Sequence, residues 1–295
     1  MKNTNTYTGP MRFVHRGLAQ VAPENTLEAF QGAVNGGYEG IEIDIQMTKD
    51  GEIVVAHDSN FTRMTLGHPR GGSNCQIKDL TWEEIRKIEL PYANHLLSEE
   101  LPEHSEIEFM AILPKLVMGQ IEGRDYKTAL AEDGRMAHLM RFSDFDAWLT
   151  SQNRKITVEV EIKAPNLSKP LIELLDNSPN ADSYILFSGK SAYIEELQST
   201  VIKDGKPAGL RLGANIRYLT EEIKKKIPKM DLFEVGLNAE AFTQEDVQWL
   251  RDRGISVLSN LGDYPEWWEK MVTLGVLGFK TNYAAAYTKW WNAQH

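Results

Sequence analysis

The chain has 295 residues, of which 42% are hydrophobic and 25% charged, and its formal net charge is −10. This composition is that of an ordinary globular protein, and the negative charge argues against a nucleic acid or an anionic membrane as partner, since both attract a basic face. The single cysteine, Cys75, excludes an intrachain disulfide.

Short apolar strands alternate with helical segments along the whole chain. Eight strands are predicted, at residues 11–15, 40–46, 155–165, 183–189, 208–214, 231–237, 254–260 and 276–281. Helices are predicted at residues 26–36, 81–88, 142–154, 168–177, 190–202, 219–226, 243–253, 264–274 and 284–293. The order favours a (β/α)8 TIM barrel, and a doubly wound sheet is the alternative that periodicity leaves open.

The local signals in the N-terminal third add detail to this pattern. Asn25 is predicted as the N-cap of helix 26–36. A ninth, short strand at 52–57 follows the turn at Asp50-Gly51, a dipeptide typical of hairpins. We expect this strand to pair with strand 40–46 rather than to belong to the barrel.

The segment 91–141 does not fit the alternation. It is too long for a connection inside a compact domain and contains three prolines and mixed charge. We interpret it as an inserted subdomain or lid at the active-site mouth, carried by a single domain that spans residues 1–295.

Acidic side chains share one face of two predicted strands. Residues two apart in a strand point the same way, so Glu42 and Asp44 share a face, and so do Glu159 and Glu161. Polar residues late in a barrel strand lie where barrel enzymes keep their active sites. Three such carboxylates would suit Mg²⁺ or Ca²⁺, whereas a solvated edge strand is the simpler alternative.

Two histidines follow predicted strands near these carboxylates. His15 ends the first strand and His57 ends the hairpin strand. Two histidines beside a metal–carboxylate site can serve as general base and general acid. We place Glu159 one layer deeper than Glu161, and Gln46, on the same face as Glu42, has no assigned role.

The segment from His15 to Thr65 resembles the N-terminal signature of the glycerophosphodiester phosphodiesterase family. It carries, in order, HRG, PENT, an E-x-D strand, TKDG, VV-x-HD and R-x-T. Further on, VEIK at 160–163 and ILFS at 185–188 resemble later strands of that family. The stretch FTQEDVQWLRDRGISV resembles the helix–strand unit before the family's last barrel strand. The resemblance covers most of the chain except 91–141.

This resemblance implies a metal-dependent hydrolysis of a small phosphodiester to an alcohol and a phosphomonoester, through a cyclic phosphate. It implies a histidine acid/base pair, three carboxylate ligands for one divalent cation, Mg²⁺ or Ca²⁺, and two cations for the phosphate. The acid/base pair is His15 and His57. The metal ligands are Glu42, Asp44 and Glu161, and the phosphate contacts are Arg16 and Lys163. Glu24 and Asn25 of PENT are interpreted as an orienting carboxylate and a helix cap, or as substrate contacts.

The C-terminal third departs from the family pattern. The family has W-T-V-N and T-D-x-P where this chain reads VLSNLGD and KTNYA, so the pocket tryptophan is absent and Asn282 stands in the second motif. The sequence therefore does not determine which alcohol is released. The alternatives are a sugar phosphodiester of opine-like type or a phospholipase D-like barrel enzyme acting on lipids.

Two expectations concern the setting of the protein. We see no signal peptide and no apolar run of the roughly 20 residues that span a bilayer, so we expect a cytoplasmic protein without a transmembrane segment. The tryptophan pairs at 267–268 and 290–291 are interpreted as packing, with a homo-oligomer interface as the alternative.

Overall fold

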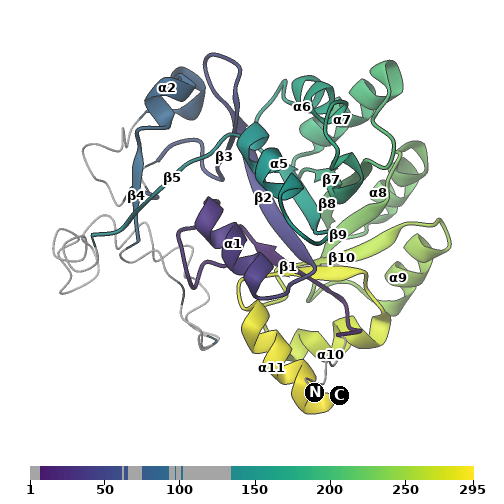
Figure 1. Cartoon of the computed structure of the whole chain (residues 1–295). Helices are drawn as coiled ribbons and strands as arrows, with labels where there is room; N and C mark the ends of the chain where they lie inside the picture. The colour runs from purple at the N-terminus through teal and green to yellow at the C-terminus, as the bar shows by residue number, and fades with distance from the viewer. Residues whose placement is uncertain (1–6, 62, 66–74, 93–96, 98–100, 102–133) are drawn as a thin grey trace.

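The structure is a computed structural model that describes residues 7–61, 63–65, 75–92, 97, 101 and 134–295. Its centre is a closed barrel of parallel strands surrounded by helices (Figure 1). The barrel strands are β1 (Met11–His15), β2 (Gly40–Met47), β6 (Thr157–Ile162), β7 (Tyr184–Phe187), β8 (Arg211–Arg217), β9 (Glu234–Asn238), β10 (Ser256–Asn260) and β11 (Gly278–Thr281).

Helices follow the strands along the chain, and most of them lie on the outside of the barrel, whereas the short helix at 82–85 lies away from it (Figure 1). They are α1 (Leu27–Asn35), α2 (Trp82–Ile85), α5 (Phe142–Thr150), α6 (Ser168–Leu175), α7 (Ser191–Asp204), α8 (Glu221–Lys226), α9 (Gln244–Arg251), α10 (Pro265–Leu274) and α11 (Ala284–Gln294). Short 3-10 helices occur at η2 (Ile77–Asp79), η4 (Ala181–Ser183) and η5 (Ile227–Lys229). Helix α2 begins with the capping box predicted from Thr81 and Glu84.

The pairing of the first strand settles the fold class. β1 pairs in parallel with β11 on one side and with β2 on the other, so the sheet has no open edge there. The predicted TIM barrel is confirmed, and a doubly wound sheet, which stays open, is excluded. The hairpin strand β3 (Ile53–Val55) pairs antiparallel with the end of β2, as predicted.

The alternation along β2 and β6 separates core from site. Ile41, Ile43 and Ile45 of β2 are buried in the layer between strands and helices, together with the apolar residues of β6 and with Phe30 of α1. The carboxylate residues between them therefore point into the barrel. Burial of the apolar face fixes which face of each strand is turned inward.

Asn25 is not the N-cap of α1, contrary to the sequence prediction. Thr26 occupies that position with extended backbone angles, and its hydroxyl accepts from the Ala29 N–H. Asn25 has φ 57°, in the left-handed region, and its side chain points toward Asp44 instead. The side-chain hydrogen bond to Asp44 thus replaces the predicted capping role.

The predicted insertion begins and ends on a strand pair that the sequence did not reveal. β4 (Glu89–Pro91) pairs antiparallel with β5 (Met136–His138), away from the barrel (Figure 1). Leu97 donates its backbone N–H to Ala19 in the loop after β1, at the carboxyl end of the barrel. The greater part of 91–141 lies outside the described residues, so its predicted role as a lid stays a prediction.

Two further features bear on the setting. Trp268 and Trp291 are buried in the core of the C-terminal half, and Trp267 and Trp290 pack against it, as the packing interpretation expects. Within the described part of the chain, no helix is long and apolar enough to cross a bilayer.

Candidate active site and metal centre

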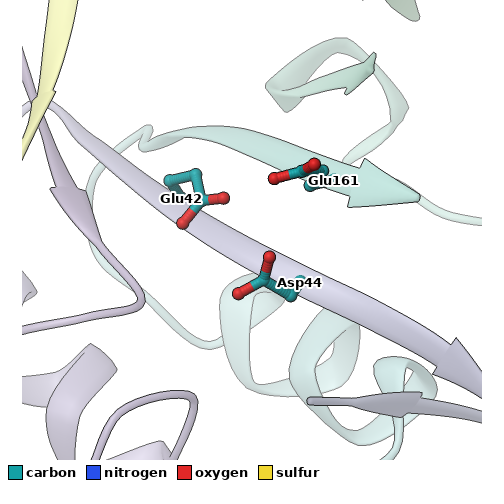
Figure 2. A group of neighbouring side chains, drawn as sticks. All are labelled: Glu42, Asp44 and Glu161. Carbon is teal, nitrogen blue, oxygen red and sulfur yellow. The ribbon is translucent and has the colours of Figure 1, made fainter. Parts of the chain in front are cut away.

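Three carboxylates converge at the carboxyl ends of β2 and β6. The two strands are neighbours in parallel register, which sets Asp44 opposite Glu161. One oxygen each of Glu42, Asp44 and Glu161 lies within 4.8 Å of the other two, and Figure 2 shows the three groups facing a common space. Oxygen donors from three carboxylates at this spacing fit a hard divalent cation such as Mg²⁺ or Ca²⁺.

The protonation behaviour of the cluster is that of a site built around positive charge. Burial, and then the neighbouring Asp44, raise the pKa of Glu42 well above its usual value. Burial would raise the pKa of Asp44 too, but Arg16 and Lys163 outweigh it and lower that pKa to about 2. Converging carboxylates are stable together only if a proton or a cation offsets their repulsion, so the residues present fit a bound metal ion.

The two predicted phosphate-binding cations lie at the edge of this cluster. Lys163 Nζ is 2.8 Å from Glu161 and 3.3 Å from Asp44. Arg16 Nε is 3.2 Å from Asp44, and Arg16 Nη1 donates to Glu24 at 2.9 Å. Both cations are thus placed to offset the carboxylates and to face an anion bound beside them.

Arg16 is held in place by a backbone conformation that side chains rarely adopt. Its φ is 57°, and its N–H donates to both the carbonyl and the carboxylate of Glu42. Left-handed backbone at a residue other than glycine costs of the order of 1 kcal/mol and is concentrated at functional sites. The backbone of the HRG turn is therefore held by Glu42.

His15 lies at the end of β1, beside Glu42. Its Nε2 is 3.8 Å from Glu42 Oε2, and its Nδ1 is 2.8 Å from Asn282 Oδ1. The side chain is only 11% exposed. Burial, followed by the charge of Arg16, lowers the pKa of His15 to about 3, so this imidazole is neutral at physiological pH.

His57 lies in a different environment, just after β3. Its Nδ1 is 2.6 Å from Asp58 Oδ1, and the ring is 25% exposed. Asp58 accepts from Arg63 at 2.7 Å, and Arg63 also binds Glu24 at 2.6 Å. A continuous series of polar contacts therefore runs from His57 to Arg16 through Asp58, Arg63 and Glu24.

Two residues that the sequence left aside have defined positions. Gln46 Nε2 donates to the His57 carbonyl at 2.9 Å, so Gln46 fixes the backbone of His57. Glu159, opposite Glu42 in the strand register, is buried and pairs with Lys280 at 3.2 Å; it is not among the carboxylates whose oxygens lie within 4.8 Å of one another.

All seven predicted site residues lie at the carboxyl end of the barrel around this cluster. Sequence reasoning missed the residues that hold the histidines. Asp58 and Arg63 are parts of the HD and R-x-T motifs, so their position beside His57 was a usable signal. Asp263, which binds Asn282, offered none, because nothing in its local sequence relates it to His15.

Comparison with protein families adds a finding that is independent of the geometry. Residues 15–286 match the model of the glycerophosphoryl diester phosphodiesterase family. Glycerophosphodiester phosphodiesterase 1 of Rattus norvegicus is 44% identical over 89 residues, which are 30% of this chain and 25% of the rat protein. This chain therefore spans only about a quarter of the length of that relative.

Solved structures resemble this chain over nearly all of its length. A phosphodiesterase of Oleispira antarctica, determined in complex with the product sn-glycerol-3-phosphate, has a TM-score of 0.68 and 15% identity, with 95% of this chain and 96% of that chain covered. Glycerophosphodiester phosphodiesterase of Thermotoga maritima has a TM-score of 0.62 and 19% identity, with 96% and 99% covered. At these identities the similarity supports the fold.

Proposed function

Because this chain belongs to the glycerophosphoryl diester phosphodiesterase family, we propose that it hydrolyses a glycerophosphodiester-like small molecule to an alcohol and a phosphomonoester. One observation carries the proposal: the three converging carboxylates contact Arg16, Lys163 and His15 directly, and a series of polar contacts connects His57 to Arg16. Acid, base and charge-offsetting groups thus surround one space.

The cations prepare that space for a phosphate. A divalent ion held by Glu42, Asp44 and Glu161 would supply Lewis-acid stabilisation of the phosphoryl oxygens. Lys163 and Arg16 are fixed by the same carboxylates, so they face the phosphate without reorganising, and preorganised positive charge is the larger part of such catalysis.

The histidines divide the proton transfers. The neutral His15 takes the proton of the attacking hydroxyl, and His57, whose partner is the Asp58 carboxylate, gives a proton to the leaving alcohol. A hydroxyl of the substrate itself is the proposed nucleophile, which forms a cyclic phosphate that water then opens. In that second step the proton transfers run in reverse.

The leaving alcohol is the part that the site residues do not define. The structural neighbour from Oleispira antarctica is described with sn-glycerol-3-phosphate as product, and we propose glycerol 3-phosphate as the phosphomonoester here. A sugar phosphodiester fits the same phosphate chemistry and is the second candidate, because the family's pocket tryptophan is replaced in VLSNLGD.

A screen of soluble diesters tests the proposal. Glycerophosphocholine, other glycerol diesters, sugar phosphodiesters and lipid vesicles are incubated with Mg²⁺, Ca²⁺ or Mn²⁺, and alcohol and phosphomonoester release are followed. We expect release from a soluble diester, lost on chelation and restored by one cation. Activity that survives exhaustive chelation would remove the metal from the proposal, and activity on vesicles alone would replace the substrate class.

A further inference from the structure

Asn282 links His15 to a buried carboxylate. Its Oδ1 lies 2.8 Å from His15 Nδ1, and its Nδ2 donates to Asp263 Oδ2 at 2.7 Å. The other oxygen of Asp263 accepts from the Thr281 hydroxyl and from the Asn282 backbone N–H, each at 2.8 Å. Asp263, which follows β10, and Asn282, which follows β11, therefore form one connected unit.

The direction of each hydrogen bond follows from the donor inventory. A carboxylate only accepts, so the amide NH₂ of Asn282 must face Asp263 and the amide oxygen must face His15. An amide oxygen also only accepts, so His15 Nδ1 must carry a hydrogen. The second ring nitrogen of a neutral His15 is then an acceptor.

We propose that Asp263 and Asn282 are a positioning pair that fixes His15 as the Nδ1–H tautomer, with Nε2 free to accept the proton of the attacking hydroxyl. The structural part concerns the chain alone, while its use in proton transfer rests on the proposed function. Nε2 is the nitrogen that faces the carboxylate cluster, 3.8 Å from Glu42. The opposite tautomer would present an N–H there and could not act as a base.

The unit makes a sharp prediction for Asp263→Asn. The new amide oxygen keeps the two donors at Thr281 and the Asn282 backbone, so the new NH₂ faces Asn282. The Asn282 amide must then turn, its own NH₂ faces His15 Nδ1, and His15 changes to the Nε2–H tautomer. The double variant Asp263→Asn/Asn282→Asp exchanges amide and carboxylate and restores the acceptor facing His15.

The tautomer can be read without substrate. Protein labelled with ¹⁵N-histidine is examined near pH 7.5 by long-range ¹H–¹⁵N correlation, and the His15 signals are assigned by their loss in His15→Gln. We expect the Nδ1–H tautomer in the wild type, the Nε2–H tautomer in Asp263→Asn and the Nδ1–H tautomer again in the double variant. An unchanged tautomer in folded Asp263→Asn overturns the proposal, as does Nε2–H in the wild type.

Kinetics on the diester found by the screen supply the second readout. Because a wrong tautomer disables a catalytic histidine, kcat should fall roughly 10²- to 10⁴-fold in Asp263→Asn with little change in KM, and should recover in the double variant. If the tautomer follows the prediction while wild-type activity is absent from every diester, the proposed function fails and the pair stands. If the tautomer follows the prediction but kcat does not change, its catalytic use is wrong.

A matched control exists at the opposite end of the barrel. Asp146 is also a buried carboxylate that accepts from an asparagine amide, Asn180 at 2.9 Å, and from the Tyr184 hydroxyl at 2.7 Å. Asp146→Asn should lower the stability but leave the His15 tautomer and kcat as in the wild type. A comparable change of kcat in this control would mean that loss of stability explains the Asp263 result.

Discussion

The two histidines of the site are held by opposite means. His15 is nearly buried and pairs with a neutral amide, behind which stands the carboxylate of Asp263. His57 is more exposed and pairs directly with the carboxylate of Asp58, behind which stands Arg63. The proposed roles follow this difference: His15, whose ring is kept neutral by burial, is the proposed base, and His57, oriented by a carboxylate, is the proposed acid.

The largest effect should come from removing each histidine in turn. An aryl phosphodiester has a good leaving group and needs little help from an acid, whereas an alkyl diester needs it fully. Each proton transfer by a positioned side chain accelerates such a reaction roughly 10²- to 10⁴-fold. His57→Gln should therefore lose much more activity on the alkyl than on the aryl substrate, and His15→Gln should lose about equally on both.

For each variant, initial rates at saturating cation give the loss of activity on the alkyl and on the aryl substrate, and the ratio of these two losses is compared between the variants. Circular dichroism of both variants shows whether they fold. If His15→Gln is the variant with the leaving-group dependence, the assignment of acid and base is reversed.

The carboxylates between the two histidines are the next test. Burial and then Asp44 raise the pKa of Glu42, and Glu42→Gln removes this proposed ligand together with its repulsion for Asp44. We expect activity to fall roughly 100-fold, since a bound metal is worth several kcal/mol in such reactions. The metal-free variant should melt no lower than the wild type.

Thermal unfolding with and without Mg²⁺, Ca²⁺ or Mn²⁺ separates these effects. The wild type should gain Tm with the native cation, and Glu42→Gln should gain little. Glu173→Gln, on the exposed surface of α6, is the control that should behave as the wild type. A full cation-dependent gain in Glu42→Gln would mean that Glu42 is not a ligand.

The same contrast shows what a sequence can predict. The strand alternation and the family-like motifs were sufficient to predict the barrel and the positions of the three carboxylates, His15 and His57 at one end of it, because local register sets these positions. The partners of the histidines were predicted less well. Asp58 lies beside His57 in sequence, but Asp263 reaches His15 only through a contact across 267 residues between His15 and Asn282. Asn25 was wrongly predicted as an N-cap because asparagine is typical of that position, whereas its side chain donates a hydrogen bond to Asp44.

Arg63→Met should disturb the contacts behind His57 and leave those of His15 with Asn282 and Asp263 in place. Arg63 is nearly buried, and its loss leaves Glu24 and Asp58 without a shared partner. Breaking a buried pair costs about 3 kcal/mol or more, and kcat should fall about 10-fold as His57 loses its support. The His15 tautomer should not change.

The control for Arg63 is Arg141→Met, because Arg141 also binds two carboxylates, Asp144 and Glu52, but at the surface. Exposed pairs contribute about 1 kcal/mol or less. Urea unfolding of both variants gives the comparison. Equal losses in the two would show that the Glu24–Arg63–Asp58 ion pairs do not behave as a buried network.

The smallest expected effect is a difference in the pH range over which each side loses stability. Burial and then Arg16 lower the pKa of His15 from 6.5 to about 3, so the unfolded chain binds a proton below pH 6.5 that the folded chain does not. Stability is therefore lost as the pH falls from 6.5 toward 3, by about 2 kcal/mol at pH 5. Glu24 behaves differently: burial would raise its pKa, but Arg16 and Arg63 hold it well below 4.5, so its contribution is complete above that pH and is lost only below it.

Urea unfolding with chelator between about pH 7 and pH 5 distinguishes the two sides. The difference in unfolding free energy between the wild type and His15→Asn should change by about 2 kcal/mol across this range, in favour of the variant at the lower pH. The difference between the wild type and Glu24→Gln should stay constant, because Glu24 is ionised in both the folded and the unfolded chain there. A constant difference for His15→Asn would mean that the folded protein takes up a proton on His15 as readily as the unfolded chain, and burial would then not hold the ring neutral.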